Sequence, residues 1–178
     1  FNKVTNLIIG SNYISLIAAE AKAKELGYKP FLLSSSTQGE TKEIARVHVA
    51  IAHEIRATKH PVKPPACLIS GGETTVTMTT HGQGGRNQEF ALSAAIDLEN
   101  MDDVLVFSAG TDGTDGPTDA AGAMVDGTTC DRAVNFNLSP KKHLMDHNAY
   151  PFFKKLGDLV VTGPTLTNVM DVRFVLIK

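Results

Sequence analysis

The chain has 178 residues, of which 42% are hydrophobic and 20% charged, and its formal net charge is −2. This composition supports a buried core and excludes wholesale disorder. The weak net charge argues against binding to duplex nucleic acid, and no apolar run is long enough to span a membrane.

The two cysteines, Cys67 and Cys130, have no CxxC spacing. Neither a zinc ribbon nor a disulfide framework is therefore indicated, which favours a reducing compartment. Because the sequence starts at Phe1 without an initiator Met, we interpret it as part of a longer protein. We expect a soluble cytoplasmic protein, with a mitochondrial location left open because targeting signals would lie upstream.

The first third predicts a β-α-β-α unit. An apolar run at 4–9 is typical of a buried strand, and Ser11 or Asn12 can cap a helix at 14–26. A second strand is expected at 31–33 and a second helix at 41–57, where apolar residues recur at helical spacing. Such a unit implies parallel strands joined by right-handed crossovers.

The proline-rich segment 60–65 predicts a boundary, because three prolines cannot continue a helix or a central strand. After it, strands at 66–70 and 74–80 around Gly71-Gly72 predict a β-hairpin, and Asn87 is expected to cap a helix at 88–98. The remaining expected elements are strands at 104–107, 123–125, 159–161 and 172–177 and helices at 128–134 and 148–155. The predicted fold class is α/β, with a layered mixed sheet flanked by helices.

A first glycine-rich loop, 82–89, precedes the predicted helix at 88–98. Glycines such as Gly84 and Gly85 let a backbone approach a ligand, and helix N-termini attract anions. Arg86 adds a planar fork suited to phosphate or carboxylate. The alternative is a mobile loop with a solvated arginine. The segment matches neither a Walker loop nor the dinucleotide fingerprint.

A second glycine-rich loop, 110–119, follows the predicted strand at 104–107 and carries Asp112, Asp115 and Asp119. Ligands of open α/β sheets lie at the carboxyl ends of strands, and carboxylates beside phosphates could share Mg²⁺. The alternative is a tight double turn.

Weaker candidates surround these loops. Residues 70–73 present Glu73, with a plain turn as the equal alternative, and for 163–168 an ordinary connection is favoured. His143 and His147 have the i,i+4 spacing of two metal ligands, but a surface pair is favoured.

Five ordered segments, 70–76, 84–89, 108–113, 115–123 and 167–171, together resemble the MOFRL domain of the type II glycerate kinases. The resemblance covers 65–178, so we expect a MOFRL-type domain at 61–178. Residues 1–60 resemble its lead-in or the end of a Rossmann-like region.

The resemblance implies phosphoryl transfer from ATP, with Mg²⁺, to the 2-hydroxyl of D-glycerate. Arg86 is expected to neutralise charge, and Asp112 or Asp115 to hold Mg²⁺ or accept a proton. The expected binding residues are Ser70, Gly71, Gly72, Glu73, Gly84, Gly85, Asn87, Gln88, Thr111, Asp119, Thr167 and Asn168. The expected partner is the N-terminal domain of the same protein, whose absence would leave this part inactive; a homo-oligomer is left open. The rivals are a hydroxypyruvate reductase, which lacks support from any nicotinamide fingerprint, and a non-catalytic anion-binding module.

Overall fold

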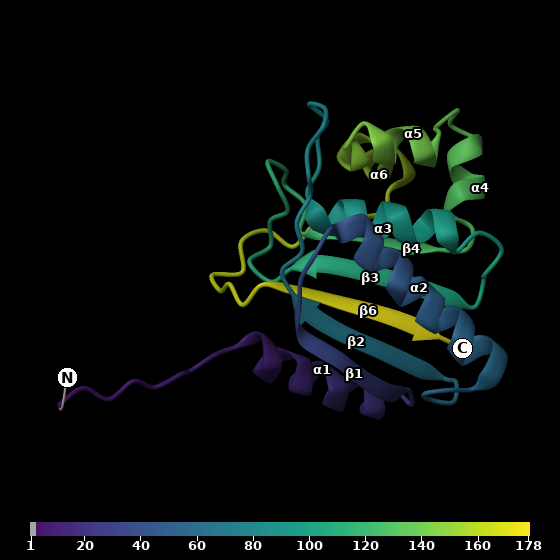
Figure 1. The fold of residues 1–178 in the computed structure, drawn as a ribbon. Coiled ribbons are helices and arrows are strands. Elements are labelled where there is room, and N and C mark those ends of the chain that lie inside the picture. The colour runs from purple at the N-terminus through teal and green to yellow at the C-terminus, as the bar shows by residue number, and fades with distance from the viewer. Residues whose placement is uncertain (1–2) are drawn as a thin grey trace.

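A computed structural model describes residues 3–178. Six strands form one mixed sheet in the order β1–β2–β6–β3–β4–β5, in which only β1 and β2 are parallel neighbours (Figure 1). The strands are β1 (Lys29–Thr37), β2 (Ala66–Gly72), β3 (Val104–Gly110), β4 (Gly122–Asp126), β5 (Leu159–Val160) and β6 (Asp171–Ile177). The mixed α/β sheet expected from the sequence is confirmed.

Helices cover both faces of the sheet. The helices are α1 (Asn12–Glu25), α2 (Thr41–Thr58), α3 (Arg86–Asp97), α4 (Thr129–Val134), α5 (Pro140–Met145) and α6 (Ala149–Leu156). One face carries α1, the other carries α2 and α3, and α4 to α6 lie over α3 (Figure 1). None of the helices within residues 3–178 is long and apolar enough to cross a membrane.

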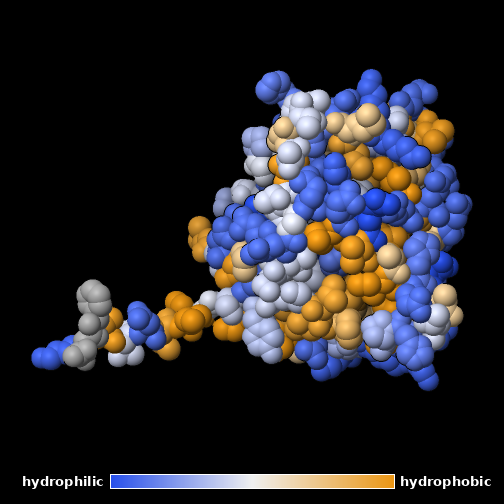
Figure 2. All heavy atoms as spheres, viewed as in Figure 1, coloured by the Kyte–Doolittle hydropathy of each residue, from blue (hydrophilic) through white to orange (hydrophobic). Residues whose placement is uncertain are grey.

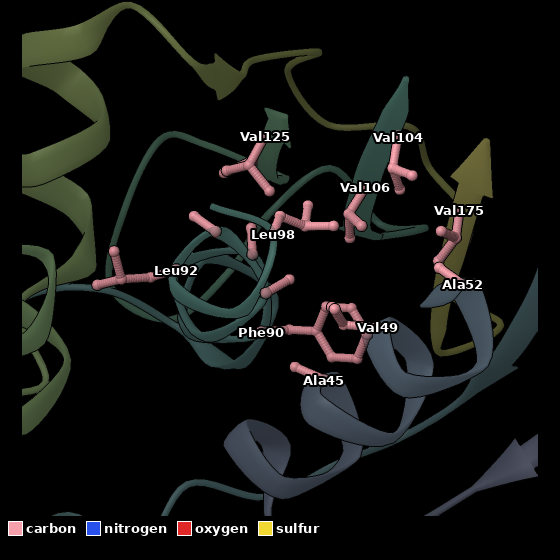
Figure 3. Close-up of a cluster of buried hydrophobic side chains, with 14 of the residues drawn as sticks. Ala45, Val49, Ala52, Phe90, Leu92, Leu98, Val104, Val106, Val125 and Val175 are labelled. Atoms are coloured by element: carbon pink, nitrogen blue, oxygen red, sulfur yellow. The ribbon is translucent and has the colours of Figure 1, made fainter. Parts of the chain in front are cut away.

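The larger core lies between the sheet and α3. Phe90 of α3 contacts the α2 side chains Ala45 and Val49, and Val106 and Val175 reach the same cluster from the sheet (Figure 3). Residues 87–95 of α3 are all buried, because the sheet, α2 and the α4–α6 layer enclose the helix. The N-terminus of α3 is therefore fixed by packing on several sides.

β1 and β2 are parallel neighbours joined by α2, whereas the expected parallel unit of strands at 4–9 and 31–33 does not form. The segment 60–65 connects α2 to β2, and elements before and after it share one sheet. The expected boundary near residue 60 therefore stays a prediction about how domains divide, and it does not separate two sheets.

The expected buried strand at 4–9 is wrong. Its apolar side chains Val4, Leu7, Ile8 and Ile9 are exposed, and they lie on an extended arm that reaches away from the body (Figure 2). A strand needs a hydrogen-bonded neighbour, and within residues 3–178 no other strand lies beside this segment.

The expected β-hairpin is also wrong, because both edges of β2 are already occupied by β1 and β6. The segment after β2 instead lies against the start of α2, where Thr75 accepts a hydrogen bond from the Thr41 amide and donates one to the Gly39 carbonyl. This arrangement brings residues 73–78 alongside the N-terminus of α3.

Two smaller differences concern element ends, and a third is a missed helix. β1 extends to Thr37, and β3 extends to Gly110, through residues expected to be loops. Helix α5, which the sequence analysis missed, starts after Ser139, whose side chain accepts from the Lys142 amide.

Candidate functional site

The two glycine-rich loops interlock at the N-terminus of α3. A Cβ at Gly85 would lie 2.4 Å from the Asp115 carboxyl carbon, and one at Gly116 would lie 2.2 Å from the Gly84 carbonyl oxygen. Gly116 also has φ 62°, which favours glycine. The two loops therefore form one unit, and they need glycines because their backbones touch.

Asp115 caps α3 in place of Asn87. The structure places the N-cap at Gly85, so the expected Asn87 cap is wrong. The Asp115 carboxylate accepts hydrogen bonds from the backbone amides of Asn87 (3.0 Å) and Gln88 (2.9 Å). Burial nevertheless raises the pKa of Asp115 to about 6, because desolvation outweighs these hydrogen bonds.

Asp171, at the start of β6, fixes the orientation of Arg86. Nε and Nη2 of Arg86 donate to the Asp171 carboxylate at 2.8 and 2.9 Å, and Arg173 donates to it at 2.9 Å. Since Asp171 is fully buried, this bidentate pair is shielded from water. The hydrogen bonds with Asp171 raise the pKa of Arg86 above its already high ordinary range.

The outer nitrogen of Arg86 faces a carboxylate at the cavity rim. Nη1 lies 2.8 Å from Oε1 of Glu73, whose side chain is 53% exposed, against 32% for Arg86. An exposed ion pair of this kind contributes little to stability, so an incoming anion can replace Glu73 at small cost.

A cavity of about 700 Å³ opens beside this pair. It is lined by residues from five segments: Gln38, Gly39, Glu73, Thr74, Thr75, Val76, Met78, Gly84, Gly85, Arg86, Glu89, Asp115, Gly116, His147 and Ala149. Its size suits a small ligand or part of a nucleotide. Five of the expected site residues, Glu73, Gly84, Gly85, Arg86 and Asp115, are thus brought together.

Other expected site residues lie outside the cavity. Asn87 and Gln88 are buried, and both donate to Asp115. Ser70 is buried and contacts His48, and Asp119 accepts from the Tyr150 hydroxyl. Gly71 and Gly72 end β2.

A second polar group forms between the 110–119 loop and the segment before β6. Asn168 donates to Asp112 at 3.2 Å, and Thr111 donates to the Met170 carbonyl at 2.6 Å. Asp112, Thr111, Thr167 and Asn168 do not line the cavity. Among residues 3–178, no group of three or more His, Cys, Asp or Glu side chains is placed to hold a metal ion.

Sequence reasoning missed Asp171, Glu89 and His147. His147 is buried and contacts Glu89, so the expected surface pair with His143 is wrong for His147. Glu89 could have been found as the last residue of the first glycine-rich segment, whereas nothing in the sequence links it to His147, 58 positions away.

Residues 66–171 match the MOFRL family. The chain belongs to this family. It is 47% identical over 153 residues to a D-glycerate 2-kinase of Thermotoga maritima. The matched region covers 86% of this chain and 37% of that protein. A crystal structure of a glycerate kinase from the same organism superposes with a TM-score of 0.95 at 44% identity, over 97% of this chain and 42% of that one.

Another similar protein carries a different name. A putative hydroxypyruvate reductase of Agrobacterium vitis is 43% identical, over 96% of this chain and 39% of its own length. The chain thus spans less than half the length of each of these relatives.

Proposed function

We propose that the chain is the C-terminal part of an ATP-dependent glycerate kinase, which transfers the γ-phosphate of ATP to the 2-hydroxyl of D-glycerate. The observation that carries this proposal is Arg86, held by buried Asp171 with its outer nitrogen at the cavity rim. The kinase names of similar proteins over this region support the reaction class.

Arg86 and the neighbouring glycines supply the chemistry that phosphoryl transfer needs most, which is positioning and charge neutralisation. In the proposed complex, the guanidinium binds the glycerate carboxylate or the transferred phosphate in place of Glu73. Gly84 and Gly85 let the backbone approach that group, and Glu73 then orients the substrate.

The residues fit a metal carried with ATP better than a metal held by the chain alone. Mg²⁺ bound together with phosphates needs one or two carboxylates, where it offsets phosphate charge. Asp112 fits this role because it is partly exposed, whereas the Asp115 carboxylate is occupied as the α3 cap. We therefore assign Asp115 a positioning role, and Asn168 orients Asp112.

The proposed partner in catalysis is the remaining N-terminal part of a protein as long as the relatives, which would close the cavity from its open side. The other binding residues expected from the sequence act indirectly, through Arg86, Asp112 and Asp115. They are Ser70, Gly71, Gly72, Asn87, Gln88, Thr111, Asp119 and Thr167.

The test is ATP-dependent phosphorylation of D-glycerate by the full-length protein. Arg86→Ala should lower kcat/KM by about 100-fold or more, the scale of a lost charge-stabilising group. Arg86→Lys should also lower kcat/KM, because an ammonium cannot reproduce the bidentate contact with Asp171. Arg46→Ala, an exposed arginine on α2, is the control. An Arg86→Ala enzyme within a factor of about two of the wild type would refute the assignment.

The reductase name in Agrobacterium vitis supplies a second candidate. Oxidation of NADH or NADPH with hydroxypyruvate, without any ATP-dependent glycerate phosphorylation, would favour it over the kinase.

A further inference from the structure

Glu89 and His147 form a buried pair in the lining of the cavity. Nδ1 of His147 lies 2.9 Å from Oε2 of Glu89, and the side chains of His147 and Glu89 are only 6% and 4% exposed. The other ring nitrogen of His147 lies 3.1 Å from the Thr79 hydroxyl. Both residues line the cavity that Arg86 and Glu73 border at the more exposed end.

The second oxygen of Glu89 lacks a partner. Oε1 is buried and has no hydrogen bond to any residue within 3–178. A buried carboxylate oxygen without a donor is costly, so the cavity beside it indicates that a bound molecule supplies the donor. Glu89 lines the cavity, and the outermost torsion of a glutamate is broad, so rotation of the carboxylate lets a bound molecule meet this oxygen.

The spacing of Arg86 and Glu89 fits a small hydroxy acid. The two residues are three positions apart on α3, which separates their Cβ atoms by about 5–6 Å on one helix face. A ligand carboxylate on Arg86 would therefore bring its hydroxyl groups to Glu89. The lining holds three carboxylates, Glu73, Glu89 and Asp115, and one arginine, so it favours a ligand whose remaining groups donate hydrogen bonds.

We propose that Glu89, oriented by His147, accepts a hydrogen bond from the 3-hydroxyl of bound glycerate and thereby selects glycerate over 2-hydroxy acids that lack this group. The inference rests on the proposed function. The 3-hydroxyl is assigned because the 2-hydroxyl has to meet the phosphoryl donor on the exposed side, near Glu73 and Arg86, whereas the Glu89 side chain is only 4% exposed. A site built to hydrogen-bond a hydroxyl rejects an analogue without it strongly, because its polar group is then left unpaired.

The test compares D-glycerate with D-lactate, which keeps the carboxylate and 2-hydroxyl but lacks the 3-hydroxyl. In the full-length wild type, kcat/KM for D-glycerate should exceed that for D-lactate by about 10⁴-fold. Glu89→Met, which fills the space without an acceptor, should lower the D-glycerate value about 100-fold. It should leave the D-lactate value within about threefold. Glu89→Gln keeps an acceptor oxygen, so its kcat/KM for D-glycerate should lie between the values of the wild type and Glu89→Met.

Glu99→Gln, an exposed carboxylate just beyond α3, is the matched control and should retain wild-type discrimination. A Glu89→Met enzyme that phosphorylates D-glycerate with unchanged discrimination overturns the inference and leaves the proposed function standing. Discrimination below about tenfold in the wild type overturns it as well, even if Glu89→Met fails to fold. A wild type with no glycerate phosphorylation overturns the proposed function and this inference together.

Discussion

At the scale of single residues, burial shifts the pKa values of two side chains in opposite directions. Burial raises the pKa of Asp115 to about 6 and lowers the pKa of His48 to about 4. Between about pH 4 and 6, folded Asp115 binds more protons than the unfolded chain does, so its contribution to stability falls as pH rises. Folded His48 binds fewer protons, so its contribution rises over about pH 4 to 6.5.

Asp115→Asn separates these two effects. Because the wild-type profile combines opposing contributions, the informative quantity is the difference in unfolding free energy between variant and wild type. That difference should shift in favour of the variant by about 2 kcal/mol from pH 4 to pH 6, which is the share of the two-unit pKa shift that falls within this pH range. Urea unfolding at closely spaced pH values measures it, and a difference independent of pH would contradict the buried ionisation of Asp115.

His48→Gln should show the opposite trend. The neutral His48 ring lies 2.7 Å from the Ser70 hydroxyl and 2.8 Å from the Ile44 carbonyl, an arrangement that protonation disturbs. Relative to the wild type, the variant should lose stability as pH rises from about 4 to 6.5, because the wild type regains its neutral histidine. The same urea series checks this, and a parallel pair of profiles would be inconsistent with a depressed His48 pKa.

At the scale of elements, the attachment of α1 depends on Gly71 of β2, which has no side chain. Asn12 donates from its amide to the carbonyls of Val169 (2.7 Å) and Asp171 (2.8 Å). A Cβ at Gly71 would lie 1.9 Å from Oδ1 of Asn12. The helix therefore joins β2 to the segment before β6, and this segment leads to the aspartate that holds Arg86.

Gly71→Ala should lower the free energy of unfolding by about 1–3 kcal/mol, because the added methyl displaces Asn12 from both carbonyls. Gly10→Ala is the control, since a Cβ there meets nothing within 4 Å. Denaturant unfolding of both variants measures the difference. A free energy of unfolding for Gly71→Ala within about 0.5 kcal/mol of the wild-type value would show that α1 tolerates displacement of Asn12.

Local sequence signals predicted elements well where the signal is itself local. The Ser11 cap and the buried Phe90 face of α3 are both observed, because capping and helical spacing act over a few residues. Strand partners were predicted less well. The alternation of Thr and Val in 74–80 predicted a hairpin with β2, but β2 pairs with β6, which starts about a hundred positions later. The cap of α3 was missed for the same reason, since Asp115 comes from a distant loop.

At the scale of the whole molecule, the candidate site is assembled at one end of the sheet from segments far apart in the sequence. The sequence placed Arg86, Glu73 and Asp115 in the site through ordered motifs. It could not place Asp171 or His147, because their contacts with Arg86 and Glu89 depend on how β6 and the start of α6 pack around α3. The residues that the sequence missed are thus those whose contacts depend on long-range packing.

On the proposed function, the chain by itself should bind ligand weakly and transfer phosphate only slowly. It spans 37% of the length of the Thermotoga maritima D-glycerate 2-kinase, and the outer side of its cavity carries the exposed Glu73–Arg86 pair. Phosphoryl transfer relies on charge stabilisation in a site from which water is excluded, and an exposed rim gives little of it. ATP-dependent phosphorylation of D-glycerate by residues 1–178 should therefore be lower by at least about 10³-fold than by the longer protein. Turnover by the chain within about tenfold of the longer protein would show that this one cavity is sufficient for the reaction.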